Sequence, residues 1–125
     1  MDYLDGAAIY NTLANDSDVT TLTTAIYKAR LIPETETSLD TINCYPTSVD
    51  GGVEYFQRVW SVDCRSDNEY TSQEIASRAF ESLNRIQFSY SGKMYFTVCS
   101  ILGTIPPLDS TDVYNTPITV IVRRR

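Results

Sequence analysis

The side chains that most often carry out chemistry in proteins are scarce in this sequence, and histidine is absent altogether. Without histidine, neither a Ser-His-Asp triad nor a Cys-His pair can be built. Lys28 and Lys93 are the only lysines, so chemistry based on an amine has few candidates. The sequence therefore predicts a protein that is not an enzyme and that carries no cofactor.

Two pairs of acidic residues could be considered as the carboxylates of a hydrolase, namely Glu34 with Glu36 and Asp109 with Asp112. Each pair lies in a polar loop, where no apolar cleft would raise the pKa of one of its carboxyl groups. A solvated loop, or a loop that contacts another protein, is the better interpretation of both pairs.

Metal binding has little support in the sequence. Asp16 and Asp18 resemble the opening of a calcium loop, but no glycine or distal glutamate follows at the spacing of an EF-hand, so a cap at a helix end explains them better. Cys44, Cys64 and Cys99 are odd in number and have no paired spacing. This favours buried free thiols over a disulfide or a reactive thiol, and no metal site is predicted.

Composition and charge limit the class of protein. The chain has 125 residues and a net charge of −6, and its pI is about 4.4. This length is enough for one hydrophobic core, so we expect a single domain over residues 1–125. Because an acidic chain lacks the positive groove that single-stranded nucleic acid requires, Trp60 and the nine tyrosines are better explained as core residues than as stacking platforms.

The ends of the chain and its apolar runs give two further expectations. No apolar run approaches the ~18 residues of a membrane span, and the N-terminus does not resemble a signal peptide, so synthesis in the cytoplasm is expected. The run Arg123–Arg125 is the only basic cluster. It could contact phosphate or an acidic neighbour, and the alternative is a solvated tail.

One stretch, Val53–Arg85, organises the rest of the chain. Over Phe56–Cys64 large apolar side chains alternate with polar ones, interrupted only by Arg58, which predicts a half-buried strand. Thr71–Glu74 has the spacing of a capping box, and the apolar residues of Ile75–Ile86 fall on one helical face. A helix that leaves a strand in this way lies back across a sheet.

The first third of the chain predicts a helix, a helical turn and a hairpin strand. The helix spans residues 2–15, and a capped turn through Val19 and Leu22 follows it. Residues 26–32 are ambiguous between helix and strand. Residues 42–45 form a short strand that Pro46 ends, and the turn signal at 50–52 pairs this strand with the central one as a hairpin.

The last third predicts three more strands. Residues 86–90 and 93–102 form a second hairpin, a long loop covers 103–115, and a last strand runs over 117–123 with Pro117 at its first position. The resulting fold class is α+β, with an antiparallel sheet of about four to five strands and two flanking helices.

In order and size these features resemble the tail terminator proteins of long-tailed bacteriophages, which are also called tail-completion or tail-to-head joining proteins. The resemblance covers nearly the whole chain. Its residues are the helix end Leu13–Asp16, the turn Val19–Leu22, Ile26-Tyr27 with Pro33, Tyr45-Pro46, the strand Val59–Ser66, the helix Glu74–Leu83 and the strand Thr119–Val122.

The resemblance implies a virion structural protein at the tail-head junction, assembled in the host cytoplasm. Such a protein forms a ring, usually of six subunits, that caps the tail tube, ends its polymerisation and joins tail to head. Its partners would be other copies of the chain, the tail tube protein and a head-completion or neck protein. Genomic DNA would pass through the lumen without being read, and no membrane would be involved.

Two alternatives stay open at this stage: a head-completion protein of the neck, and a small cytosolic regulatory α+β module. A ring requires contacts between two different patches of the same chain. The two long loops, the doubly apolar strand over 94–102 and the C-terminus would be natural suppliers. The candidate interface residues are Glu34, Glu36, Tyr95, Thr97, Pro106, Pro107, Asp109, Asp112, Arg123, Arg124 and Arg125.

Overall fold

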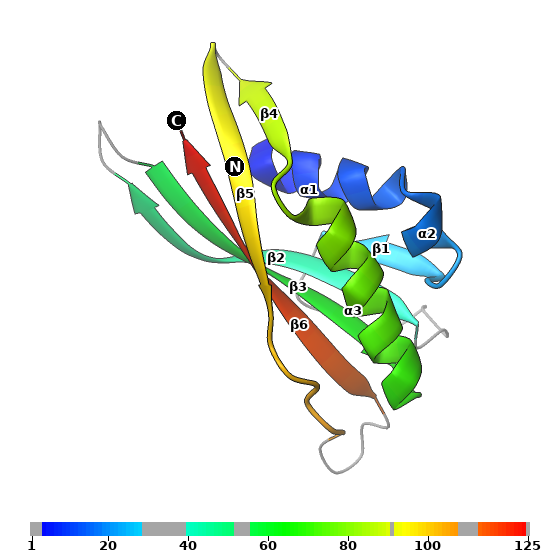
Figure 1. Cartoon of the computed structure of the whole chain (residues 1–125). Helices are drawn as coiled ribbons and strands as arrows, with labels where there is room; N and C mark the ends of the chain where they lie inside the picture. The colour runs from blue at the N-terminus through cyan, green and yellow to red at the C-terminus, as the bar shows by residue number, and fades with distance from the viewer. Residues whose placement is uncertain (1–3, 29–39, 52–55, 91, 108–112, 125) are drawn as a thin grey trace.

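Within the described residues, six strands form one sheet, and three helices pack on one of its faces (Figure 1). The computed structural model describes residues 4–28, 40–51, 56–90, 92–107 and 113–124. The elements in chain order are α1 (Leu4–Ala14), α2 (Ser17–Thr20), β1 (Ala25–Tyr27), β2 (Thr41–Gly51), β3 (Phe56–Ser66), α3 (Glu69–Leu83), β4 (Gln87–Tyr90), β5 (Lys93–Ile101) and β6 (Tyr114–Arg124).

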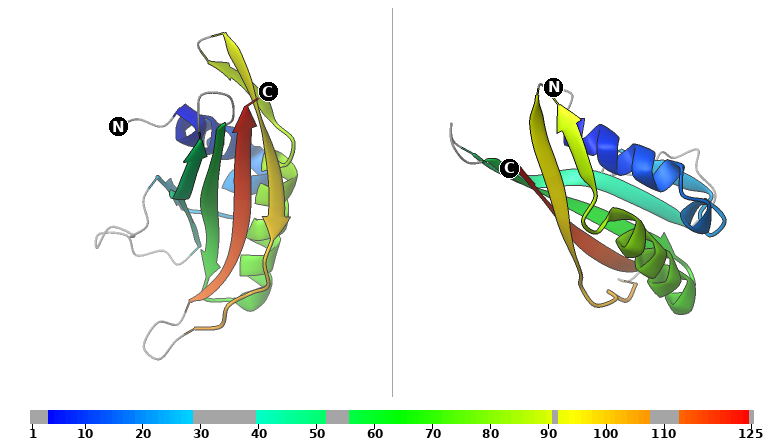
Figure 2. Two further views of the ribbon diagram at one scale, coloured as in Figure 1. Left: turned by 90° about the vertical axis from the view of Figure 1, so that its left-hand side faces the viewer. Right: turned by 45° about the horizontal axis from the view of Figure 1, so that its top comes forward.

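The predicted α+β class is confirmed, but the sheet is larger than expected and is not purely antiparallel. Its order is β1-β2-β3-β6-β5-β4, and it curls into a half-barrel (Figure 2). β1 pairs parallel with β2, whereas the other neighbours are antiparallel. β1 has three residues, which is too short for periodicity to distinguish a strand from a helical turn. The described residues form three helices where two were predicted, because the single turn α2, capped by Asp16, is also helical.

Pro46 does not end its strand, contrary to the prediction. β2 continues to Gly51, with a register shift between Pro46 and Ser48. β1 pairs with β2 only as far as Asn43, so at Pro46 the described part of the sheet gives β2 one neighbour, β3. A proline on such an edge costs no hydrogen bond of the ladder. The predicted hairpin of β2 and β3 is confirmed.

Pro117 lies inside β6 and not at its start. β6 begins at Tyr114, and the Leu102 N–H donates to the Pro117 carbonyl oxygen at 3.0 Å. β5 pairs with β6 no further than Ile101 opposite Ile118. The N and O atoms of a strand residue point to the same side. The nitrogen of Pro117 therefore faces the chain just beyond the last paired residue of β5, where no ladder hydrogen bond is lost.

α3 begins one turn earlier than its predicted cap. Asn68 is the N-cap, and its side chain accepts a hydrogen bond from the Thr71 N–H at 3.1 Å. The capping box predicted at Thr71–Glu74 is therefore wrong, because Thr71 already lies in the first turn. The predicted apolar face is confirmed, since Ile75, Ala76, Ala79 and Leu83 are buried.

The core lies between this helical layer and the sheet. Side chains of β3 and β6 alternate between the core and the opposite face, as predicted. The buried apolar residues are Ile9, Leu13, Val19, Ile42, Cys44, Trp60, Val62, Cys64, Ile75, Ala76, Ala79, Leu83, Cys99, Ile118, Val120 and Val122. All three cysteines are free and buried, as predicted. Burial of each large aliphatic side chain contributes about 1.5–3 kcal/mol, so this layer stabilises the fold.

Side-chain hydroxyl groups tie both ends of α3 to the sheet. Near its start, Ser72 Oγ donates to the Cys64 carbonyl oxygen at 2.8 Å and lies 2.9 Å from Thr116 Oγ1. After its end, Thr97 Oγ1 donates to the Leu83 carbonyl oxygen at 2.5 Å and accepts from the Ile86 N–H at 3.1 Å. These bonds set the position of the helix along the strands.

The Thr97→Val substitution should lower the free energy of unfolding by about 2 kcal/mol, because it leaves two backbone groups without their partner. Thr41 is the matched control: it is equally buried, and its Oγ1 has no hydrogen-bond partner within the described ranges. Thr41→Val should leave the free energy unchanged or raise it by up to about 1 kcal/mol. Denaturant titration of both variants tests this, and equal losses would contradict the assigned role of Thr97.

Gly6 allows α1 to approach the core closely. A Cβ atom at this position would clash with Cη2 of the Trp60 ring, which is buried. Gly6→Ala should therefore lower the thermal midpoint, because overpacking costs about 1–3 kcal/mol against about 1 kcal/mol gained in helix propensity. Gly103→Ala is the control, since a Cβ there meets no atom within 4 Å. A higher midpoint for Gly6→Ala would contradict this packing.

Candidate interaction surface

The face of the sheet opposite the helices exposes an apolar row. No described helix covers this face, which Figure 2 (left) shows toward the viewer. Val59 of β3, Ile121 of β6 and Val98 of β5 are neighbours in register and form the row across three strands. Val98 is 41 % exposed, and Met94, on the same side of β5, is also 41 % exposed. Burial of such an apolar row against another surface is energetically favourable.

Two arginines border this row. Arg123 of β6 is exposed and is paired in register with Phe96 of β5. Arg85 is exposed and lines a hollow together with Gln87, Phe96, Thr97 and Val98. We name the set Val59, Met94, Phe96, Val98, Ile121, Arg85 and Arg123 the sheet patch.

The end of α3 positions Arg85. The chain reverses there with Arg85 at a φ of 63°, and the Arg85 N–H donates to the Thr97 carbonyl oxygen at 3.0 Å. Beside it, Asn84 Oδ1 accepts from the Cys99 N–H at 3.0 Å. Through these two bonds, the chain just before β4 stays hydrogen-bonded to β5. The side chain of Arg85 is thereby carried from the helical layer to the border of the sheet patch.

The same face of the sheet is polar farther from the patch. Asp63 accepts hydrogen bonds from the Tyr45 hydroxyl and from Ser61 Oγ, both at 2.7 Å. Hydrogen bonds to an ionised carboxylate are among the stronger ones in proteins, so this carboxylate is satisfied within the chain. The face therefore has an apolar part bordered by arginine and a polar part with an internally satisfied acid.

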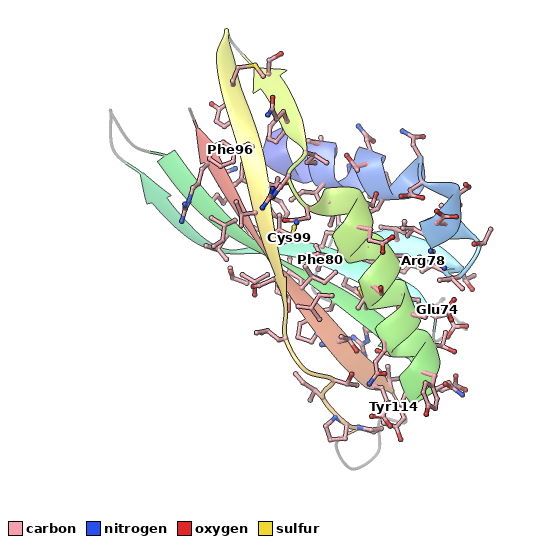
Figure 3. The ribbon with its side chains drawn as sticks, in the orientation of Figure 1. Glu74, Arg78, Phe80, Phe96, Cys99 and Tyr114 are labelled. Carbon is pink, nitrogen blue, oxygen red and sulfur yellow. The ribbon has the colours of Figure 1, made fainter. Side chains whose placement is uncertain are left out.

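A second exposed surface lies on the outward side of α3. Its exposed residues are Glu69, Tyr70, Gln73, Glu74, Ser77, Arg78 and Glu81, which we name the helix patch. Figure 3 shows Glu74 and Arg78 on the side of α3 away from the sheet. Three glutamates against one arginine make this surface acidic. Tyr70 is 84 % exposed and gives it an apolar component.

The predicted interface residues fall in three groups. Glu34, Glu36, Asp109, Asp112 and Arg125 lie outside the described residues. Pro106 is exposed and Pro107 half-buried in the segment after β5, and Arg124 is the last residue of β6. Arg123 belongs to the sheet patch.

On β5 the structure corrects the choice of residues. Thr97 is 0 % exposed, and Tyr95 stacks on Phe88 at 5.4 Å on the helix-covered side. Thr97 therefore has no surface to offer a neighbouring subunit. The strand was rightly identified as apolar on both sides, but the pattern alone could not tell which side the helices cover. On the opposite side of β5, Met94 and Val98 are exposed and Phe96 is half-buried.

Sequence reasoning also missed Arg85 and Tyr70. Arg85 is the last residue of the stretch Val53–Arg85 that the sequence singled out, and the chain reversal after Leu83 brings it to the sheet patch. Tyr70 immediately precedes the predicted cap and lies within the helix because α3 starts at Glu69. Recognition of Asn68 as the cap would have placed Tyr70 in the first turn.

The described residues contain no group of three or more His, Cys, Asp or Glu side chains arranged to hold a metal ion. Burial raises the pKa of the Cys44 and Cys99 thiols to about 12, and it raises the pKa of Cys64 well above the ordinary value. Protonated thiols are poor nucleophiles. Within the described ranges no helix has the length and apolar character needed to cross a membrane.

Comparison with known proteins gives a match among the solved structures. No family model matches the sequence, and no curated protein matches it. Among solved structures, a chain of the structure described as "Virion of native gene transfer agent (GTA) particle" has a similar fold, with a TM-score of 0.68 and 16 % sequence identity. The match covers 95 % of this chain and 92 % of that chain. At this identity the likeness shows a shared fold over almost the full length.

The buried thiols predict a loss of stability at alkaline pH. The unfolded chain releases thiol protons near pH 9, whereas folded Cys44 and Cys99 retain theirs up to about pH 12. The unfolded state then binds fewer protons, so the free energy of unfolding should fall as the pH rises from 9 toward 12. Denaturation at several pH values measures the slope. Replacement of Cys99 by Ala should reduce the slope, and an unchanged slope would contradict this assignment.

Proposed function

We propose that this protein is a structural component of a bacteriophage-like virion, and specifically that it forms a ring at the junction of tail and head. The observation that carries the proposal is the likeness over 95 % of the chain to a chain of a gene transfer agent virion. In this role the ring would cap the tail tube, end its polymerisation and present a surface to a head-completion protein.

The distribution of exposed residues supports a ring. The sheet patch and the helix patch lie on opposite sides of the molecule and differ in chemistry (Figures 1 and 3). Contacts between two different patches of one chain generate closed rings or open filaments, whereas contacts of one patch with itself stop at a dimer. The net charge of −6 supports the passage of DNA, because an acidic lumen repels phosphate and does not retain it.

We also propose that the protein has no enzymatic activity. The absence of histidine in the whole chain supports this, as do the raised thiol pKa values of the three cysteines. Asp63 is engaged within the chain by Tyr45 and Ser61. A role through protein-protein contact fits these side chains best.

A head-completion protein of the neck is the second candidate. The same likeness favours it, because the matched chain is described only as part of a whole virion. The two candidates differ in partner: a tail terminator binds the end of the tail tube, whereas a head-completion protein binds on the side of the head.

Electron microscopy of lysates separates the two candidates. An early stop codon in this gene, in the particle that encodes it, should give overlong or ragged tails beside filled heads, because tube growth is no longer capped. Normal-length tails that fail to join, or heads that lose their DNA, would assign the protein to the neck. Normal infectious particles would contradict a virion role, and a plasmid copy of the intact gene serves as the control.

A further inference from the structure

We propose that the sheet patch of one copy binds the helix patch of the next copy, head to tail. This inference rests on the proposed function and names the two surfaces that would build the ring. The sheet patch offers apolar area with arginines at its border, and the helix patch offers a tyrosine among glutamates.

The sheet patch has the composition of the central part of a protein interface. Val98 and Met94 are each 41 % exposed, and Val98 continues in register into Ile121 and Val59. Phe96 and Val98 line a hollow, with Arg85 and Gln87 at its border. Aromatic residues, methionine and arginine are enriched in interfaces, and a hollow beside a flat apolar row can accept a large side chain.

The helix patch provides a side chain of that kind. Tyr70 is 84 % exposed at the start of α3, and Glu74 lies one turn later on the same side. Gln73 Nε2 donates to Thr104 Oγ1 at 3.1 Å, which holds the exposed Ile105 beside this part of the helix. The patch therefore combines apolar contact area with negative charge.

Charge complementarity selects a second copy as the occupant of the sheet patch. Arg85 and Arg123 attract an acidic partner and disfavour a basic one, and the helix patch carries three glutamates against one arginine. Opposite charges on facing surfaces speed association and suppress wrong pairings. Because the two patches lie on opposite sides of one molecule, each bound copy presents a free patch for the next.

The test uses two variants of the full chain that each disable one patch. Val98→Asp places a carboxylate in the apolar row, and Tyr70→Lys with Glu74→Lys places cations where the arginines of the neighbour would approach. Lys28→Glu is the control, since Lys28 is exposed and belongs to neither patch. Analytical ultracentrifugation measures the mass of each protein over a range of concentrations, and circular dichroism checks that each is folded.

Head-to-tail binding predicts a specific pattern. The wild type and Lys28→Glu form oligomers, whereas each patch variant alone weakens self-association about tenfold or more and sediments as a monomer. An equimolar mixture of the two variants forms a dimer that does not grow, because one intact sheet patch meets one intact helix patch.

Three outcomes would overturn the inference. The first is that Val98→Asp assembles like the wild type. The second is that the helix-patch variant assembles while Val98→Asp does not, which would mean that the sheet patch binds another surface. The third is a wild type that stays monomeric at millimolar concentration. None of them would exclude a virion role, because microscopy of particles without this gene tests that role independently.

Discussion

The apolar layer between the helices and one face of the sheet is the constraint on which the rest of the structure depends. Hydrogen bonds set the position of α3 against this sheet, because Ser72 joins its start to Cys64 and Thr97 joins its end to β5. Cys44, Cys64 and Cys99 lie in this core, where burial raises the pKa of their thiols.

The same layer decides which surfaces remain for other proteins. The described helices cover one face of the sheet, so Val59, Val98 and Ile121 keep part of their surface exposed on the other face. The outward side of α3 remains exposed for the same reason. A small domain with one two-layer core thus has two chemically different surfaces, which is the property that a ring subunit requires.

Much of the local structure could be predicted from periodicity. The strand before α3, the apolar face of α3 and the two hairpins were correctly placed, because each has a repeat of 2 or 3.6 residues over several turns or pairs. The incorrect strand boundaries are those that depend on where a neighbouring strand ends. Pro46 and Pro117 are tolerated inside strands because β1 and β5 have already ended beside them.

The sequence alone sufficed for the α+β class and for the buried free thiols. These conclusions depend on residue types and on local repeats, which the chain order contains directly. Only the tertiary structure decided which side of β5 the helices cover. It also brings Arg85 to the same hollow as Phe96 and Val98. A strand that is apolar on both sides looks the same from either face until the helices cover one of them.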